Sequence, residues 1–492
     1  MTQTLDQLRR AAKRLQKHYD ENQADAVHRL RLHPPRKGDD FKLKRADFLH
    51  VIAQENGFES WPKLKLASEI AGYEHAEKQQ RLKIALIHGQ SHVVAQLLVD
   101  SPHLADGAFG LQCALLDLPA VRSTLAQDPD AAIRTFGPRR PILHLAFSRY
   151  VHARPDLQQD MLAIAELLVS HGADVNDGYP FAAGDTDLLS ALYGALGHAD
   201  NLPLAAWLLA HGANPNDNES LYHSTELGHS EGLALLLKFG ADPKGTNALL
   251  RALDFNNHVM VEMLLRAGSL HQEGGAITSL HQAARRGCDA EMARLLLRYG
   301  ADVSLTWEGR SAHVLAQIYG NTAFADVVAD AGGGEALSAD EQRLADAAVG
   351  LPTVGLLTDP TQATFLLGDI IRRTGGVPHA KALVALGADT DALFDQGLPL
   401  LQVAGWEGQP EAFAWALTLS PDLSAVNGYG GDLMSTIVHG SENCPARANR
   451  DHIACARLAL TAGAVLAPHV VAFTGEPAMA EFLESWDGSP EI

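Results

Sequence analysis

A ten-residue phrase recurs along this chain, and its copies end in Gly-Ala-Asp or a close variant. The first clear copy covers residues 167–176 and reads Leu-Leu-Val-Ser-His-Gly-Ala-Asp-Val-Asn. The glycines of five successive copies are Gly172, Gly212, Gly240, Gly268 and Gly300. They are separated by 40, 28, 28 and 32 residues. A period of about thirty residues predicts a solenoid, in which each unit packs only against its neighbours.

The residue types in the phrase indicate how each copy folds. The paired leucines cover one face of a helix. The glycine ends that helix, because glycine adopts a left-handed backbone without steric strain. The Asp or Asn that follows suits a tight turn, since its side chain bonds its own backbone. Each copy therefore predicts the end of a helix followed by a turn.

A second signal lies upstream of the phrase. It is clearest at 279–287, which read Ser-Leu-His-Gln-Ala-Ala-Arg-Arg-Gly, and it also occurs at 141–146. Together the two signals resemble the ankyrin repeat, whose first helix opens with Thr-Pro-Leu-His-x-Ala and whose helix pair closes with Leu-Leu-x-x-Gly-Ala-Asp. The match is strong over residues 140–330 and degenerate elsewhere. The resemblance implies an all-α, ankyrin-type helical-repeat solenoid with a small helical N-terminal cap, and little sheet.

Residues 1–73 lack the repeat and form the first of three expected segments. Phe58 and Trp61 lie in the string Gly-Phe-Glu-Ser-Trp-Pro-Lys-Leu, which resembles the short helical segment that precedes the repeats of many bacterial ankyrin proteins. We expect both rings to anchor a capping core, since a solenoid end has an apolar face to cover. A DNA-reading role for these basic helices is the alternative. The repeat array is expected at 74–335, and degenerate repeats with a C-terminal cap at 336–492.

Charge is unevenly distributed along the chain. Residues 1–70 hold 14 Lys and Arg against 10 Asp and Glu, whereas the remainder holds 25 against 49. An acidic solenoid repels phosphates, so we expect no nucleic-acid partner. The acidic body instead favours a basic protein partner, with solubility alone as the alternative explanation.

The sequence also bears on where the protein works. No apolar run approaches the length that spans a bilayer, and the N-terminus lacks an apolar signal-peptide region. The four cysteines show no disulfide framework. We therefore expect a cytoplasmic protein without a membrane association.

Histidine is abundant, with 23 residues, so metal binding and acid–base chemistry must be considered. His144 and His281 match the ankyrin histidine, and the resemblance implies that each ring bonds the backbone of the adjoining loop. Cys444, His452 and Cys455 form the only Cys/His cluster, but their spacing provides no second ligand pair for a structural zinc. We expect no metal, no cofactor and no catalytic residue, although a triad that converges only in space stays open.

Aligning the copies on their helix-ending glycines places certain side chains on the concave surface, which inner helices and finger turns line in ankyrin-like proteins. Aromatic and arginine side chains are favoured partner anchors. The partner-binding candidates are Tyr179, Phe181, His223, Glu226, Asp254, Phe255, Arg285, Arg286, Trp307, Arg310, Tyr319, Trp406 and Glu407. Trp307 is expected to be exposed because it lies in a finger. For Trp406, packing on a neighbouring repeat is an equal alternative.

These observations predict non-enzymatic recognition of a macromolecular partner, most simply a protein, through the concave groove and finger loops. Insertions at 177–185 and 441–450 are expected to add specificity, because insertions in solenoids map to loops on one face. One alternative is an immunity or inhibitor protein that covers a basic toxin or enzyme. Another is an enzyme or a small-molecule-binding solenoid with a pocket in the groove or in the degenerate C-terminal half.

Overall fold

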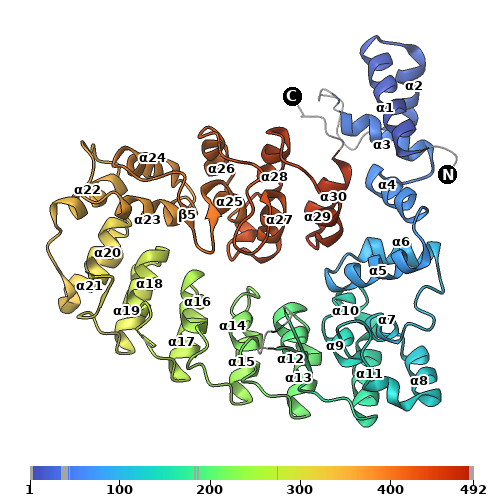
Figure 1. Ribbon diagram of the computed structural model, residues 1–492, viewed down its shortest axis with the longest axis horizontal. Coiled ribbons are helices and arrows are strands. Elements are labelled where there is room, and N and C mark those ends of the chain that lie inside the picture. Colours follow the sequence, from blue (N-terminus) through green and yellow to red (C-terminus); the bar gives the residue numbers. More distant parts are fainter. Residues whose placement is uncertain are drawn as a thin grey trace. The chain divides into compact units, whose positions relative to one another are not determined.

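The structure is a computed structural model that describes residues 4–34, 43, 45–181, 184, 188–273 and 275–486. Helices account for most of its regular secondary structure (Figure 1). The α-helices are α1 (Leu5–Asp20), α2 (Ala24–Leu32), α3 (Arg45–Glu55), α4 (Trp61–Ile70), α5 (His75–Ile87), α6 (Ser91–Asp100), α7 (Phe109–Ala114), α8 (Leu118–Gln127), α9 (Pro141–Ala146), α10 (Tyr150–Ala153), α11 (Gln158–Ser170), α12 (Ala191–Tyr193), α13 (Leu202–Ala210), α14 (Ser220–Ser224), α15 (Glu231–Lys238), α16 (Ala248–Asp254), α17 (His258–Arg266), α18 (Ser279–Arg286), α19 (Ala290–Arg298), α20 (Ala312–Ile318), α21 (Thr322–Val328), α22 (Ala339–Ala348), α23 (Thr361–Ile370), α24 (Val377–Ala385), α25 (Leu400–Trp406), α26 (Pro410–Leu417), α27 (Leu433–Asn443), α28 (His452–Thr461), α29 (Pro468–Phe473) and α30 (Pro477–Ser485). Short 3-10 or π-helical segments are η1 (Pro129–Ala132), η2 (Pro155–Leu157), η3 (Gly194–His198), η4 (Ala329–Gly333) and η5 (Arg447–Asn449).

The repeated phrase folds as its residues predict. Its five glycines have left-handed φ values between 88° and 95°, and each lies two residues beyond the last residue of a helix. One leucine of each preceding helix is fully buried, namely Leu168, Leu208, Leu236, Leu264 and Leu296. Burying a leucine contributes about 1.5–3 kcal/mol relative to leaving it exposed. The phrase therefore ends a helix and anchors it in the core at the same time.

Three finger turns contain short antiparallel hairpins. The strand pairs are β1 (Gly178–Pro180) with β2 (Leu188–Ser190), β3 (Thr306–Trp307) with β4 (Arg310–Ser311), and β5 (Leu393–Phe394) with β6 (Leu398–Pro399). Sheet content in the described chain is small, and the predicted all-α helical-repeat solenoid is confirmed. The expected insertion at 177–185 includes β1, while its residues 182, 183 and 185 lie outside the described residues.

The chain divides into two compact units. Unit 1 combines Met1–Ala108 with Leu460–Ile492, and unit 2 is Phe109–Ala459. These bounds differ from the three segments expected from composition and repeat pattern. The difference arises because helices from both ends of the chain pack on one another.

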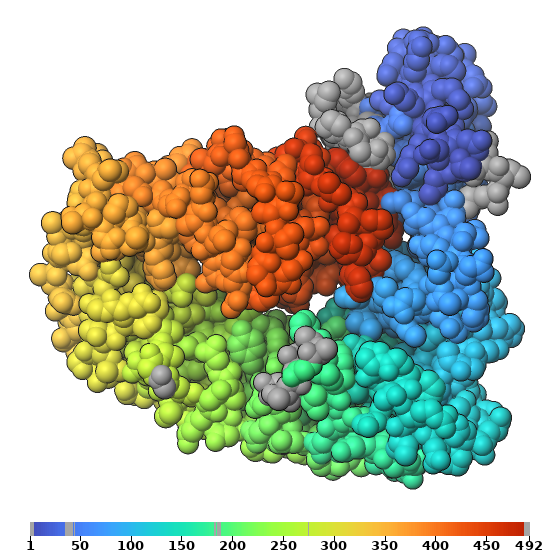
Figure 2. All heavy atoms as spheres, in the orientation of Figure 1, coloured from blue at the N-terminus to red at the C-terminus, as the bar shows by residue number. Residues whose placement is uncertain are grey.

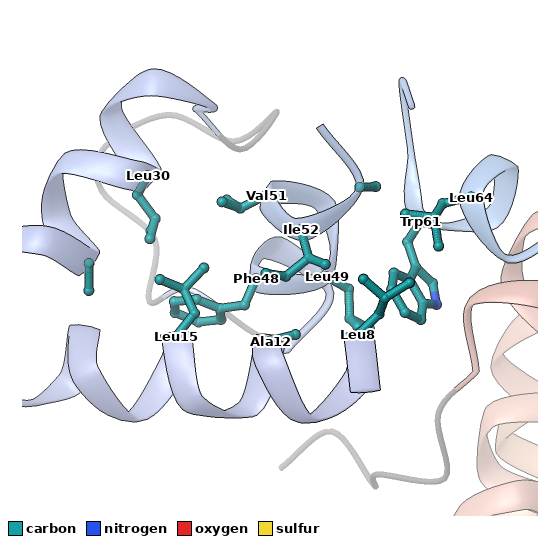
Figure 3. Packing of buried hydrophobic residues seen from close by; sticks show 12 residues of the cluster. Leu8, Ala12, Leu15, Leu30, Phe48, Leu49, Val51, Ile52, Trp61 and Leu64 are labelled. Carbon is teal, nitrogen blue, oxygen red and sulfur yellow. The ribbon is translucent and has the colours of Figure 1, made fainter. Parts of the chain in front are cut away.

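The N-terminal helices of unit 1 share a hydrophobic core (Figure 3). Leu8 and Leu15 of α1 pack with Phe48 of α3, and all three are at most 1% exposed. Trp61, at the start of α4, is 3% exposed, and Phe58 packs on the same core. The expected role of the two rings as core anchors is confirmed.

The C-terminal helices complete unit 1. Helix α29 packs on α5, and α30 packs on α4. Arg81 and Gln90 are buried, and each donates a hydrogen bond of 3.2 Å to the carbonyl of Ala472. Gln90 also bonds the carbonyl of Thr474. These two side chains therefore bond backbone carbonyls at the C-terminal end of α29 and just beyond it.

Unit 2 stacks helix pairs in two layers (Figure 1). The inner row contains α7, α9, α12, α14, α16, α18 and α20, and the outer row contains α8, α11, α13, α15, α17, α19 and α21. Beyond α22 the chain returns, so that α23 lies beside α18 and α20. In Figure 2 the yellow region of α18–α20 and the orange region of α23–α25 form a continuous surface.

Candidate functional site

Polar and ionised side chains at the ends of the inner helices of unit 2 form a connected row. Local spacing produces part of it. Arg251 and Asp254 are three residues apart on one face of α16, and His223 of α14 meets Glu226 just beyond the end of that helix. We name this row the inner ladder, and its members are Glu219, His223, Glu226, Arg251, Asp254, Gln282, Arg285, Arg286, Tyr319 and Asp369.

The ladder begins at a histidine between two carboxylates. His223 Nδ1 lies 2.7 Å from Glu226 Oε2, and its Nε2 lies 3.2 Å from Glu219 Oε2. Burial alone would lower the pKa of His223, but the hydrogen bonds and charges of both glutamates raise it to about 9. His223 is therefore a cation at neutral pH. Arg251 Nη2 lies 2.6 Å from the other oxygen of Glu226 and carries the row to the next repeat.

Asp254 connects two further repeats. It accepts a hydrogen bond of 3.0 Å from Arg251 Nη1. Its other oxygen accepts hydrogen bonds of 2.6 Å from Gln282 Nε2 and 2.8 Å from Arg286 Nε. The sequence-predicted residues Asp254 and Arg286 are thus direct partners across neighbouring inner helices.

Asp369 of α23 lies at the end of the ladder and is 5% exposed. Arg285 donates to its two oxygens at 2.6 and 3.0 Å, and the Tyr319 hydroxyl donates at 2.6 Å. Burial alone would raise the pKa of Asp369. The charge and hydrogen bonds of Arg285, assisted by the charge of Arg286, instead lower it to about 2. Asp369 is therefore a buried carboxylate ionised at neutral pH.

Reasoning from the repeats missed Asp369. It belongs to the region where the repeated phrase is degenerate, so no alignment on glycine places it opposite Arg285. One local signal could have identified it, because Asp369 is the single charged residue in the apolar stretch 365–371. A buried carboxylate requires a partner, but the sequence does not indicate which cation provides it.

Two arginines that follow α23 extend the polar surface. Arg372 Nη2 donates 2.7 Å to Asp395 of the next finger, and its Nη1 lies 3.3 Å from Glu407. Arg373 donates to the backbone carbonyls of Tyr319 and Arg285, at 2.7 Å each. The predicted candidate Glu407 therefore contacts an arginine that sequence reasoning did not select.

The aromatic candidates on the inner helices are less accessible than expected. Tyr319 is 1% exposed, because its hydroxyl bonds Asp369 and the Arg373 guanidinium covers its ring at 5.1 Å. The expectation that Tyr319 offers an exposed anchor is wrong. Phe255 is half-buried, with the Arg251 guanidinium 5.3 Å from its ring centroid.

Both candidate tryptophans pack on other rings. Trp307 is half-buried, and its ring centroid lies 6.0 Å from that of Phe365. Its expected exposure is wrong, because α23 approaches the finger that carries it. Trp406 is half-buried, with its ring centroid 5.2 Å from that of His439. This geometry agrees with the packing alternative for Trp406.

The remaining candidates lie on fingers. Phe181 is 82% exposed. Tyr179 is half-buried, with the Arg139 guanidinium 4.3 Å from its ring centroid. Arg310 Nε lies 3.3 Å from Glu341 Oε1. Among these three, Phe181 offers the most accessible side chain.

The histidines assigned a structural role have one. His281 Nε2 lies 3.0 Å from the Arg310 carbonyl, and His144 Nε2 lies 2.9 Å from the Phe136 carbonyl, as the resemblance implied. His452 likewise lies 2.9 Å from a backbone carbonyl, that of Trp406. Within the described residues, no group of three His, Cys, Asp or Glu side chains could hold a metal ion.

Comparison with known proteins supports the repeat assignment. Residues 277–307, which contain α18 and α19, match the family model of the ankyrin repeat. No curated protein matches the chain. Among solved structures, the chain is similar to the human ASB11 ankyrin repeat domain, with 21% identity and a TM-score of 0.36, over 46% of this chain and 99% of that one. The match at 277–307 supports the ankyrin family, whose repeats are generally protein–protein interaction modules. No helix in the described part of the chain is long and apolar enough to cross a membrane.

Proposed function

We propose that this protein binds another protein through the inner ladder and the finger loops of unit 2. The observation that carries the proposal is the exposure of large side chains on three fingers of unit 2, the unit that also holds the inner ladder. Phe181, Leu393 and Tyr429 are 82%, 67% and 76% exposed. Aromatic side chains are enriched among the residues that dominate binding at protein–protein interfaces, and such exposed rings on fingers are therefore candidate anchors.

The ladder favours binding because its side chains are already ordered. Immobilising a flexible side chain on association costs about 0.5–1.5 kcal/mol. Asp254 holds Arg251 and Arg286 in place before any partner binds. Asp369 does the same for Arg285 and Tyr319. A partner therefore meets a surface whose polar groups need little further ordering.

Other features extend this proposal. Residues 1–73 act as a cap, and their likeness to the segment before bacterial ankyrin repeats suggests a bacterial-type protein. The four cysteines are free and buried, which suits a reducing compartment such as the cytoplasm. An inhibitor that covers a basic enzyme would be one form of the same recognition.

Affinity capture from native lysate with quantitative mass spectrometry tests the proposal. Wild-type protein should retain one protein in near-stoichiometric amount, and Phe181→Ser/Tyr429→Ser should lose it. The control is Val99→Ser/Val259→Ser, which removes two exposed apolar side chains from helices instead of fingers. The proposal fails if wild type captures no such protein, or if the finger variant retains it as well as the control.

A further inference from the structure

The C-terminal fingers of unit 2 lie in a segment without positively charged Lys or Arg. The 65 residues from 382 to 446 contain neither residue type, but they contain eight Asp and Glu. Five of these carboxylates belong to two successive fingers at 388–399 and 419–432, namely Asp389, Asp391, Asp395, Asp422 and Asp432. We name these two fingers the acidic finger strip. Such a one-signed cluster produces a negative potential that attracts cations.

Two cavities lie on either side of Leu393, which is 67% exposed. One has a volume of about 290 Å³ and lies between α23 and β5, with Phe365 and Phe394 in its lining. The other has a volume of about 210 Å³ and lies between β5 and the next finger, with Leu419 in its lining. Both fall below the roughly 300–1,000 Å³ of small-molecule sites, and each has room for one apolar side chain. The carboxylate of Asp395 borders the first cavity, and those of Asp391 and Asp422 border the second.

Hydrogen bonds fix the two fingers to each other. Asn427 is buried, donates 2.8 Å to Gln402 Oε1, and accepts backbone hydrogen bonds from Tyr429 and Gly431. Gly428 N donates 2.7 Å to the Gln396 carbonyl of the preceding finger. A Cβ at position 428 would lie 2.2 Å from that oxygen, so only glycine permits this approach. The strip is therefore preorganised, which lowers the ordering cost of binding.

We propose that the acidic finger strip docks an extended, basic segment of a protein partner, in which apolar side chains alternate with Lys or Arg. This inference rests on the proposed function and specifies its partner. Two apolar side chains enter the cavities beside Leu393, and the basic side chains meet Asp391, Asp395 and Asp422. Charge complementarity selects a cationic segment, because the two arginines that border the strip and its cavities are already paired. Arg372 pairs with Asp395 and Glu407. Arg285, which lines the first cavity, pairs with Asp369.

The test uses full-length protein and labelled 12-residue peptides in fluorescence anisotropy. The main probe carries two leucines and four arginines. One comparison peptide has glutamate in place of arginine, and the other has serine in place of leucine. The protein variants are Leu393→Ser/Asp391→Asn and the control Leu270→Ser/Asp330→Asn. Leu270 is also exposed and lines a similar inter-finger cavity of about 240 Å³, and the control makes the same change of charge.

Wild type should bind the main probe at least tenfold more tightly than either comparison peptide, with affinity that falls steeply as salt is added. The strip variant should lose at least tenfold, and the control should keep wild-type affinity with an unchanged thermal midpoint. Preference for the glutamate peptide, no binding of the main probe, or equal losses in both variants would overturn the inference. If capture from lysate still yields a partner in that case, the proposed function stands and only the docking strip is wrong.

Discussion

Asp369 offers a quantitative test of how the inner ladder stabilises unit 2. Removing one member of a buried ion pair leaves the other charge uncompensated and costs about 3–5 kcal/mol. Here Asp369 is 5% exposed and Arg285 is 16% exposed by side chain, so solvent can replace little of the lost interaction. We expect Asp369→Ala to lower the free energy of unfolding of this region by about 3–5 kcal/mol.

The pKa of Asp369 gives an independent magnitude. Its folded value of about 2 lies below the ordinary value of 3.8, which corresponds to about 2–3 kcal/mol of stabilisation of the ionised form. Because the folded pKa is lowered, this stabilisation is present above pH 3.8 and is lost as pH falls toward 2. The difference in stability between wild type and Asp369→Asn should therefore be constant above about pH 5 and shrink below pH 4.

Guanidinium unfolding followed by circular dichroism measures the total change, and hydrogen exchange over 279–286 and 361–370 shows where it acts. Asp330→Ala is the matched control, since Asp330 is exposed, and such surface changes stay within about 0.5 kcal/mol. A loss below about 1 kcal/mol for Asp369→Ala would refute the central role of this ion pair. That role would also be refuted if the difference in unfolding free energy between wild type and Asp369→Asn were the same at pH 2.5 as at neutral pH.

Three other predictions follow from the structure. Because the folded pKa of His223 is about 9, its stabilising contribution should be complete below pH 6.5 and lost as pH rises through 9. In an NMR titration, Glu226→Gln should lower the measured pKa of His223. A wild-type pKa of 6.5 or lower would contradict the prediction. Gln90→Ala removes the side-chain donor to the buried Thr474 carbonyl and one of the two donors to that of Ala472, and it should destabilise unit 1 by about 1–3 kcal/mol. Hydrogen exchange over 468–485 should become faster, and unchanged exchange there would count against this role of Gln90. Deleting residues 1–70 should lower the thermal midpoint and leave partner binding intact; lost binding at an unchanged midpoint would disprove the capping role.

Several members of the ladder could be predicted, because aligning the repeats on their closing glycines identifies equivalent positions on successive inner helices. Alignment on the closing glycines selected His223, Asp254 and Arg286, and in the structure these side chains belong to one connected row through Glu226 and Arg251. The ankyrin resemblance also implied that the His281 ring bonds the backbone of the adjoining loop, and it does so at the Arg310 carbonyl. These predictions succeed because the contacts are made within one repeat or between adjacent repeats.

Contacts between distant segments were not accessible in this way. Asp369 meets Arg285 across 84 residues, and this contact also buries Tyr319. The Trp307 finger likewise packs on Phe365 of α23. Tyr319 and Trp307 are aromatic residues of the kind that often anchor a partner. Both are covered here by α23, which lies far along the chain.

The sequence by itself determined the helix ends, the turns and the apolar faces, because these depend on local backbone preference and on leucine spacing. The tertiary structure decided which charges pair, which aromatic rings remain exposed, and that the two chain ends share unit 1. Those outcomes depend on where the degenerate repeats return against the earlier ones. No local pattern encodes that return, since it follows from packing summed over many helices.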